Sequence, residues 1–413
     1  MLRRIARSSW RSRVCLTTAI LVPGLLFFPQ LGGAALAAAG TGSSGNAAAA
    51  NLPVVTVPGY TVSVFARGSG ANSQPDAVVA ADQHLYVAYQ NNTAKDGSDH
   101  KSTVILAYRP DGTVDGTYSV VGHCDGLRVD PRTHLLWALV NNDANPALYT
   151  INPRTGATIP YQFSGAPHGG GYDDVAFVGG QAFISASNPT LDPNGVNKFP
   201  AVDLVALQEG TALLTPVLAG NAPAVDATTQ KTTTLNEIDP DAMSVDVQGN
   251  VVLVNQAGSE LVFLSQAGTA QQSVRRVLVG TQLDDTVWPG SGSGRLFVVD
   301  GKQNTIYVLH AQFTAGTAYT STPNDSGVAG IVGIVDLGSG VVNPVATGFS
   351  SATGLAFVGD DQFGPVTPAA GPVPGMPATG TPAGAGWATL LGLALVILLA
   401  GVRLRRVALT NCR

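Results

Sequence analysis

Residues 125–143 read DGLRVDPRTHLLWALVNND. An acidic residue opens this stretch, a short apolar run follows, the chain turns at Asp-Pro, and a second apolar run ends in Asn-Asn-Asp. Apolar runs of this length, bounded by Gly, Pro, Asn and Asp, are typical of short β-strands. The stretch therefore predicts two consecutive strands joined by a turn.

The same pattern recurs along the chain, with starts about 43 to 69 residues apart. The other copies are DAVVAADQHLYVAYQNN from Asp76, DDVAFVGGQAFISASNP from Asp173, DAMSVDVQGNVVLVNQAG from Asp241, DDTVWPGSGSGRLFVVDGKQN from Asp284 and TGLAFVGDDQF from Thr353. Further runs such as ALYTIN, ATIPYQF and TIYVLH supply third and fourth strands, and no amphipathic helix lies between them. Repeats of about 40 to 50 residues with four short strands each predict a β-propeller.

Six repeats over residues 52–361 predict an all-β, six-bladed propeller, with seven blades as the alternative. The last repeat lacks outer strands, so we expect the N-terminal segment LPVVTVPGYTVSVFARG to supply them and close the ring. We interpret NPTLDPNGVNKFP, NAPAVDATTQKTTTLNEID and FTAGTAYTSTPNDSG as loop insertions.

The repeat, with its D-G-L-x-V-D start, resembles extracellular six-bladed propellers related to NHL-repeat, SMP-30/gluconolactonase-like and YncE-like proteins. In the metal-dependent lactonases of that set, a Glu near the start of the domain binds the metal together with Asn and Asp from later blades. This sequence has no Glu before Glu209, which argues against that hydrolase chemistry.

Propeller geometry predicts that the repeat starts meet at one face of the central channel. The ring would comprise Asp76, Asp125, Asp173, Asp241 and Asp284, with Thr353 in the sixth place. The ends of the second strands would add Asn91, Asn92, Asn141, Asn142, Asp143, Asn188, Asn255, Gln256 and Asp300. Such oxygen ligands suit Ca²⁺; in the alternative, the aspartates cap backbone N–H groups of the turns.

His123 and His168 precede inner strands and are therefore expected near the same channel mouth. The sequence HGGG after Pro167 looks like the oxyanion loop of lipases, but that motif needs a G-x-S-x-G elbow, which the chain lacks. We therefore assign no catalytic residue. The candidate ligand or metal residues are the five aspartates, His123, His168, Asn141 and Asn255.

The N-terminal residues 1–39 predict a secretory signal peptide. Five arginines within the first 13 residues precede an apolar segment and then the small residues GGAALAAAGTG. An uncleaved membrane helix is the alternative, and Pro23 and Pro29 would interrupt it.

The C-terminal region predicts an anchor in three parts. Residues 362–382 form a Pro/Gly-rich stalk, 383–402 an uncharged transmembrane segment, and 403–413 a basic cytoplasmic tail. The stalk contains Met376, Pro377, Ala378, Thr379 and Gly380, which resemble the Leu-Pro-x-Thr-Gly cell-wall sorting signal of Gram-positive surface proteins, with Met in place of Leu. The resemblance implies a sortase-like transpeptidase that joins Thr379 to the cell wall; a plain single-span membrane anchor is the alternative.

The charge and the cysteine content limit the functions and the cross-links that the sequence supports. The chain has 22 Lys and Arg against 27 Asp and Glu, and nine of the basic residues lie in the two terminal segments, so the body is acidic and a nucleic-acid-binding role is not indicated. Cys124 is the one cysteine of the body, which excludes an internal disulfide there. We predict a surface-displayed, non-catalytic module that binds a ligand or protein; an extracytoplasmic metal-dependent hydrolase is the alternative.

Overall fold

The computed structural model describes residues 52–324, 327 and 329–363. The predicted signal peptide, sorting motif, transmembrane segment and basic tail, and almost all of the stalk, lie outside these residues. Within the described part of the chain, no helix is long and apolar enough to cross a membrane.

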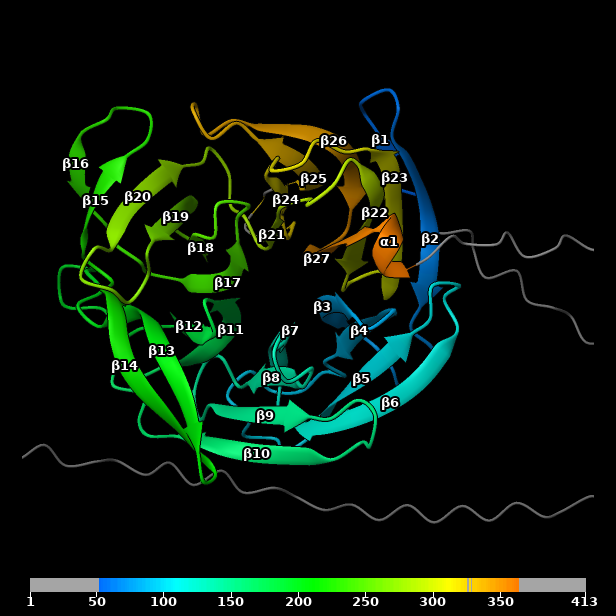
Figure 1. Ribbon diagram of the computed structural model, residues 1–413, viewed down its shortest axis with the longest axis horizontal. Coiled ribbons are helices and arrows are strands. Elements are labelled where there is room, and N and C mark those ends of the chain that lie inside the picture. Colours follow the sequence, from blue (N-terminus) through cyan, green and yellow to red (C-terminus); the bar gives the residue numbers. More distant parts are fainter. Residues whose placement is uncertain (1–51, 325–326, 328, 364–413) are drawn as a thin grey trace, which may run out of the picture. The chain divides into compact units, whose positions relative to one another are not determined.

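Six four-stranded units are arranged around a central axis (Figure 1). Their innermost strands contact one another in the order β3, β7, β11, β17, β21, β27 and back to β3. This closed circuit identifies the described residues as a β-propeller with six blades.

The first four blades each use four consecutive strands, from the innermost to the outermost. Blade 1 comprises β3 (Pro75–Ala81), β4 (His84–Tyr89), β5 (Ser102–Tyr108) and β6 (Val114–Val121). Blade 2 comprises β7 (Cys124–Val129), β8 (Leu136–Val140), β9 (Ala147–Ile151) and β10 (Thr158–Phe163). Blade 3 comprises β11 (Gly171–Val178), β12 (Gln181–Ser187), β13 (Pro200–Gln208) and β14 (Thr211–Ala219). Blade 4 comprises β17 (Pro240–Val245), β18 (Val251–Asn255), β19 (Glu260–Ser265) and β20 (Ser273–Leu278).

Two additions join or widen these blades. The outer strands β10 and β14 pair in parallel over two residues, which links blades 2 and 3 into one eight-stranded sheet. The segment predicted as a loop after blade 3 instead contains a hairpin of β15 (Pro223–Asp226) and β16 (Thr232–Thr234), and β15 pairs in parallel with β20.

Blades 5 and 6 exchange strands. Blade 5 comprises β21 (Thr286–Val287), β24 (Tyr319–Ser321), β25 (Gly330–Val335) and β26 (Val342–Phe349), and β1 (Val54–Val55) adds to its outer edge. Blade 6 comprises β27 (Ala352–Gly359), β22 (Ser293–Asp300), β23 (Thr305–Gln312) and β2 (Thr61–Arg67). The short helix α1 (Asp360–Phe363) follows β27.

This exchange corrects the fifth repeat of the sequence analysis. The run RLFVVD, interpreted there as the second strand after Asp284, belongs to β22 and pairs with β27, with Leu296 opposite Phe357. The true second strand of blade 5 is β24, which lies in the segment interpreted as a loop. Both runs are short and apolar, so their composition could not indicate which neighbouring inner strand each one pairs with.

The N-terminal segment closes the ring, but it supplies only one of the outer strands predicted for the last blade. β2 pairs with β23 as the outermost strand of blade 6, with Thr61 opposite His310, whereas β22 and β23 form the two strands between it and β27. β1 pairs with β26 of blade 5. The first two of the described strands therefore hold the last two blades.

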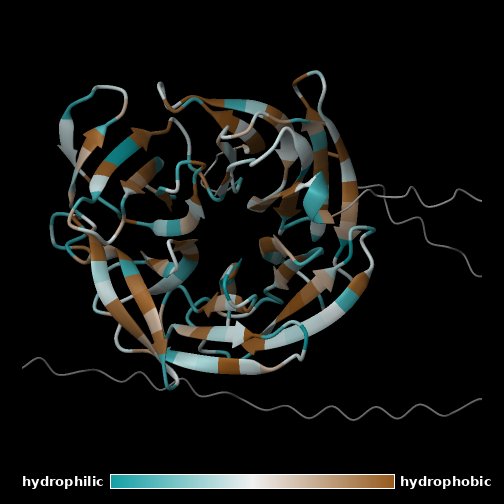
Figure 2. Cartoon of the chain, in the orientation of Figure 1, coloured by the Kyte–Doolittle hydropathy of each residue, from teal (hydrophilic) through white to brown (hydrophobic). Residues whose placement is uncertain are grey.

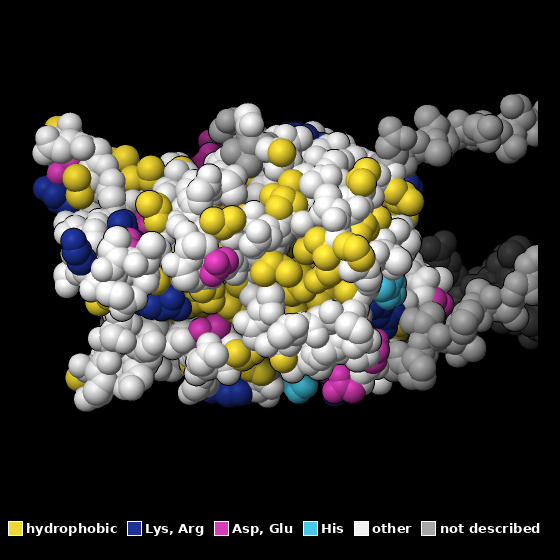
Figure 3. All heavy atoms as spheres, turned by 90° about the horizontal axis from the view of Figure 1, so that it is seen from above, with side chains coloured by type: hydrophobic (Ala, Val, Ile, Leu, Met, Phe, Trp, Pro, Cys, Tyr) yellow, Lys and Arg dark blue, Asp and Glu magenta, His cyan; other side chains and the backbone are white. Residues whose placement is uncertain are grey.

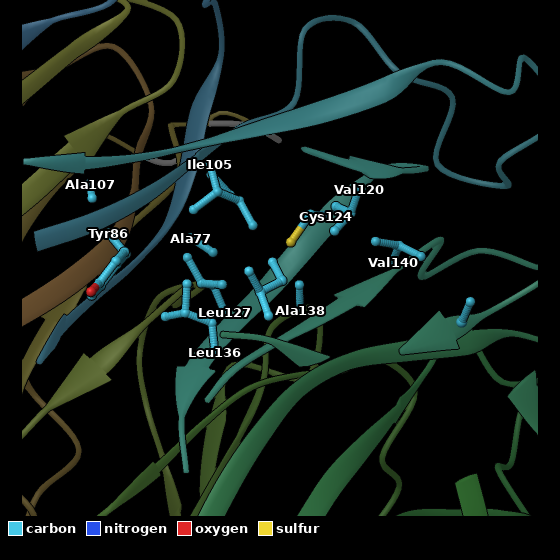
Figure 4. Packing of buried hydrophobic residues seen from close by; sticks show 13 residues of the cluster. Ala77, Tyr86, Ile105, Ala107, Val120, Cys124, Leu127, Leu136, Ala138 and Val140 are labelled. Carbon is cyan, nitrogen blue, oxygen red and sulfur yellow. The ribbon is translucent and has the colours of Figure 1, made fainter. Parts of the chain in front are cut away.

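The core lies between the blades. Six clusters of buried hydrophobic side chains occupy the six gaps between neighbouring blades. Figure 4 shows the cluster between blades 1 and 2, which contains the fully buried Cys124. Trp137 and Phe177 meet edge to face at 5.2 Å across the gap between blades 2 and 3. Such packing holds the blades in a ring and fixes the positions of the inner strands.

The hydropathy of the residues follows the pattern of strands and loops. Hydrophobic residues concentrate in the strands, and the connecting loops are more hydrophilic (Figure 2). Seen from the side, the ring shows hydrophobic side chains gathered near its middle, with charged side chains scattered around them (Figure 3).

Candidate functional site: an acidic cavity at one mouth of the channel

All six inner strands run in the same direction along the channel, so their first residues meet at one mouth. Asp76, Asp125, Asp173, Asp241, Asp284 and Thr353 all line a single cavity of about 330 Å³ there. Nine aspartates line this cavity, against three basic side chains, Lys95, Arg128 and His123. We call it the acidic cavity.

The opposite mouth has a different character. A second cavity of about 360 Å³ is lined by later residues of the same inner strands, including Val78, Val129, Val175 and Phe357. Arg128 lines both cavities, so its guanidinium lies where the polar half of the channel gives way to the apolar half.

The other sequence-predicted residues divide between the cavity and the turns around it. His123 and Asn142 line the acidic cavity, whereas His168, Asn141 and Asn255 do not. His168 is fully buried, and its Nε2 donates a hydrogen bond to the Gly171 carbonyl at 2.7 Å.

Asn141 and Asn255 stabilise turns. The Oδ1 of Asn141 accepts a hydrogen bond from the backbone N–H of His123 at 3.0 Å. The Oδ1 of Asn255 accepts from the backbone N–H groups of Asp239 and Gly258, both at 3.2 Å. These two amides therefore position the backbone at the mouth rather than face a ligand.

His123 and Asp125 form a close pair in the cavity wall. His123 Nε2 lies 3.1 Å from Asp125 Oδ1, and His123 Nδ1 lies 2.9 Å from the carbonyl oxygen of Thr93. The Thr93 hydroxyl also lies 2.9 Å from Nδ1 and can donate to it, whereas the Thr93 carbonyl can only accept, so these contacts fit either a neutral or a protonated imidazole. Gln90 also donates a hydrogen bond to Asp125.

The electrostatics follow from this pairing. Burial tends to raise the pKa of Asp125, but His123 and Lys95 outweigh it and hold the pKa below its usual value. Burial tends to lower the pKa of His123, but the charges of Asp125 and Asp76 outweigh it and raise the pKa. Burial, followed by the charge of Asp125, raises the pKa of Asp76 to about 7.

The other three aspartates at the repeat starts are strongly affected by burial. Burial, followed by the charges of neighbouring aspartates, raises the pKa values of Asp173, Asp241 and Asp284 well above their ordinary value. Two of these side chains also have amide donors: Asn142 Nδ2 lies 3.3 Å from Asp173 Oδ2, and Gln256 Nε2 lies 3.1 Å from Asp284 Oδ2. Burial and mutual repulsion therefore both disfavour the charged form of these three carboxyl groups.

In the pairs Asp173-Asp174 and Asp284-Asp285, the second aspartate has a structural role. Asp174 Oδ2 accepts a hydrogen bond from the N–H of Met243 in blade 4, and Asp285 Oδ2 accepts one from the N–H of Leu355 in blade 6. Each carboxylate thus ties one blade to the next. Arg128 lies 2.5 Å from Asp174 and 3.5 Å from Asp285 and balances their charge.

Sequence reasoning missed Lys95, Gln90 and Arg128. Lys95 lies in a loop outside the repeat, so no pattern singled it out. Arg128 lies within residues 125–143, but nothing in this apolar run indicates that its side chain faces the channel. Only the closed arrangement of the six blades shows that Arg128 lines the channel.

The chemistry of the donors suits a hard cation, since carboxylate and amide oxygens are the ligands of Ca²⁺. Their arrangement does not: among the described residues, no group of three or more His, Cys, Asp or Glu side chains is placed to hold a metal ion. We therefore derive no chemical step from a bound metal.

Comparison with known proteins gives similarity of structure only. No family model and no curated protein matches the sequence. The chain is similar to a protein of unknown function from Bacteroides caccae, at 10% identity over 73% of this chain and 99% of the other, with a TM-score of 0.42.

Two enzymes are also among the similar structures. The periplasmic gluconolactonase of Pseudomonas aeruginosa has 10% identity over 69% of this chain and 88% of its own, with a TM-score of 0.40. Virginiamycin B lyase from Staphylococcus aureus has 10% identity over 73% and 97%, with a TM-score of 0.40. These values carry no argument about activity, and the fold rests on the sheets described above.

Proposed function

We propose that this protein is a cell-surface-anchored β-propeller that acts as a non-catalytic ligand- or protein-binding module, with the acidic cavity as its binding site. The observation that carries the proposal is the convergence of all six repeat starts on one cavity with a large excess of carboxyl groups. A fold alone supports many functions, so the argument rests on this cavity.

Surface attachment is the second part of the proposal. The signal-peptide pattern of residues 1–39 and the Met376–Gly380 motif, followed by an uncharged stretch and arginines, support export and anchoring by a sortase-like enzyme. Mass spectrometry of cell-wall digests tests this directly. A peptide that ends at Thr379 and is joined to peptidoglycan is expected; an intact C-terminus recovered in membranes would replace wall attachment by a membrane anchor.

Binding is tested on the full-length chain with a panel of divalent cations, amines, polyols and lactones. The expected result is a rise in melting temperature with at least one compound and no consumption of it. Asp173→Asn should abolish the rise, whereas Asp111→Asn, in the exposed turn between β5 and β6, should preserve it. A panel member that binds both variants equally would place the binding site elsewhere.

A hydrolase is the second candidate, because Asp76, with a pKa of about 7, stands beside Asp125 and His123 as acid and base groups do in catalytic sites. A stoichiometric, tightly bound Ca²⁺, Zn²⁺ or Mn²⁺ together with hydrolysis of a lactone would establish it. Alanine at Asp125 or Asp173 should then abolish turnover while the domain stays folded. Unchanged melting on chelation would count against a structural Ca²⁺.

A further inference from the structure

The loop of residues 90–101 between β4 and β5 brings a lysine to the acidic cavity. Its backbone is fixed against blade 2: the N–H of Asp143 donates to the Lys95 carbonyl at 3.2 Å, and Asn145 Nδ2 donates to the Asp96 carbonyl at 3.0 Å. His123 holds the same loop through the Thr93 carbonyl. The loop therefore presents Lys95 in a defined place at the cavity wall.

The positive charge of Lys95 interacts with several carboxyl groups of the acidic cavity rather than with a single partner. It interacts most strongly with Asp125 and then with Asp173, Asp76 and Asp143, and these charges together raise the pKa of the ammonium. Among the described residues, its Nζ makes no hydrogen bond and no ion pair within 4.0 Å. Lys95 is also exposed, so the side chain can leave without unfolding the wall.

Two oxygen atoms in the wall of the acidic cavity that can accept hydrogen bonds have no donor. Asn142 is 6% exposed and lines the cavity, and its Oδ1 has no hydrogen-bond partner. The Oγ1 of Thr353, across the channel, also has none. A buried acceptor left without a donor costs free energy, which a ligand with N–H groups would recover.

We propose that the acidic cavity binds a primary alkylammonium group, and that Lys95 is a built-in occupant which the ligand's ammonium displaces. This rests on the proposed binding function and names its ligand class. A primary ammonium supplies three N–H donors and one positive charge on an alkyl stem, as Lys95 itself does. The group can belong to a small free amine or to the side chain of a peptide lysine.

Titration calorimetry on the full-length chain tests the ligand class. Butylamine and Nα-acetyl-lysine amide are expected to bind. Butanol and the Nε-acetylated lysine derivative have the same shapes without the charge and are expected not to bind. Binding of butylamine alone identifies the small amine as the source, and much tighter binding of the lysine derivative identifies the peptide.

Two variants test the displacement. Lys95→Gln removes the internal competitor and should increase amine affinity, whereas Lys101→Gln, which changes a lysine in the same loop that pairs with Asp99 at 3.1 Å, should leave it unchanged. Asp125→Asn should weaken binding about tenfold or more, the usual effect of losing a charge-assisted hydrogen bond. The melting temperatures of the variants show whether each is folded.

The contrary outcomes separate the two proposals. Binding of CaCl₂ with no amine binding, abolished by Asp125→Asn, would overturn the ammonium proposal and leave the cavity as the binding site. Amine affinity that is unchanged or reduced in folded Lys95→Gln would overturn the role of Lys95. Amine binding that survives both Asp125→Asn and Asp173→Asn would overturn the ammonium proposal and the cavity's binding role together.

Discussion

The guanidinium Nη2 of Arg128 lies 2.5 Å from the Asp174 carboxylate, in the middle of the propeller channel. Both side chains are largely buried, at 18% and 4% exposure. Arg128 Nη2 also donates to the Met243 carbonyl at 3.0 Å. One side chain of blade 2 thus contacts blades 3 and 4 and lies near Asp285 of blade 5.

We expect Arg128→Met to destabilise the protein by about 3–5 kcal/mol, because it leaves Asp174 and Asp285 buried without a cation. Both carboxyls have raised pKa values, to about 6 for Asp174, chiefly through burial. The loss should therefore be smaller at pH 5, where the carboxyls gain protons. Urea unfolding at pH 5 and pH 7.5 measures it, and a loss below about 1 kcal/mol at both values would show that the pair contributes little.

A second prediction concerns Glu237 and Glu260 in blade 4. Glu237 is fully buried, and neither of its carboxyl oxygens has a donor partner. The charge of Glu260 acts on Glu237, and Glu260 itself accepts hydrogen bonds from Asn255 at 3.0 Å and from Arg276 at 3.4 Å. Burial without a donor and a neighbouring like charge both disfavour the charged form of Glu237.

Burial, followed by the charge of Glu260, raises the pKa of Glu237 well above its ordinary value. The folded state therefore retains a proton that the unfolded chain releases, and this group's contribution to stability is full below the unfolded pKa and is lost as pH rises through the folded pKa. Glu237→Gln should flatten the decline between pH 5 and pH 9 and be more stable than the natural chain at pH 9. Glu209→Gln, at an exposed position, is the control and should keep the slope.

Closure of the ring by the N-terminal strand predicts a specific cross-link. Thr61 and His310 are directly opposed and exposed, so cysteines at these positions should form a disulfide under mild oxidation. Because it closes a very long loop, the bond should stabilise the protein by about 2–4 kcal/mol. Moving the second cysteine to Gln312, two residues out of register, should lower the yield sharply; equal yields would contradict the observed pairing.

The inner strands of blades 2 and 3 pack so closely that one added methyl group at Gly126 should destabilise the folded protein. A Cβ on Gly126 would lie 2.0 Å from the Asp173 carbonyl oxygen in the next blade. Gly126→Ala should therefore lose about 1–3 kcal/mol of unfolding free energy. Gly165→Ala has open space around the new methyl and is the matched control. Denaturant titration of both variants decides whether the blades can shift apart.

The repeats sufficed to predict the inner strands, the ring and the convergence of the aspartates, but not the strands β15, β16 and β24, which lie in segments interpreted as loops. Each repeat start is a local pattern, and the propeller geometry then brings these starts together. The exchange of β22 and β24 could not be predicted, because strand pairing between similar apolar runs is a long-range choice that local composition does not record.

The sequence also could not predict the roles of Lys95 and Glu237. Lys95 has no counterpart in the other repeats, and its meaning depends on four carboxyl groups brought from three blades. Glu237 follows an ordinary polar loop, and only the folded chain shows that it faces Glu260 without a donor. The roles of Lys95 and Glu237 both depend on charged groups that come close together only when the chain folds.

The direction of β27 has a consequence for display. Thr353, near its start, lies at the acidic cavity, Phe357 lies at the apolar mouth, and the chain then leaves through α1. The described part of the chain thus ends on the side of the apolar mouth. The carboxyl-rich mouth lies at the other end of the channel, so an attachment through the tail, as proposed, starts from the face that does not carry the acidic cavity.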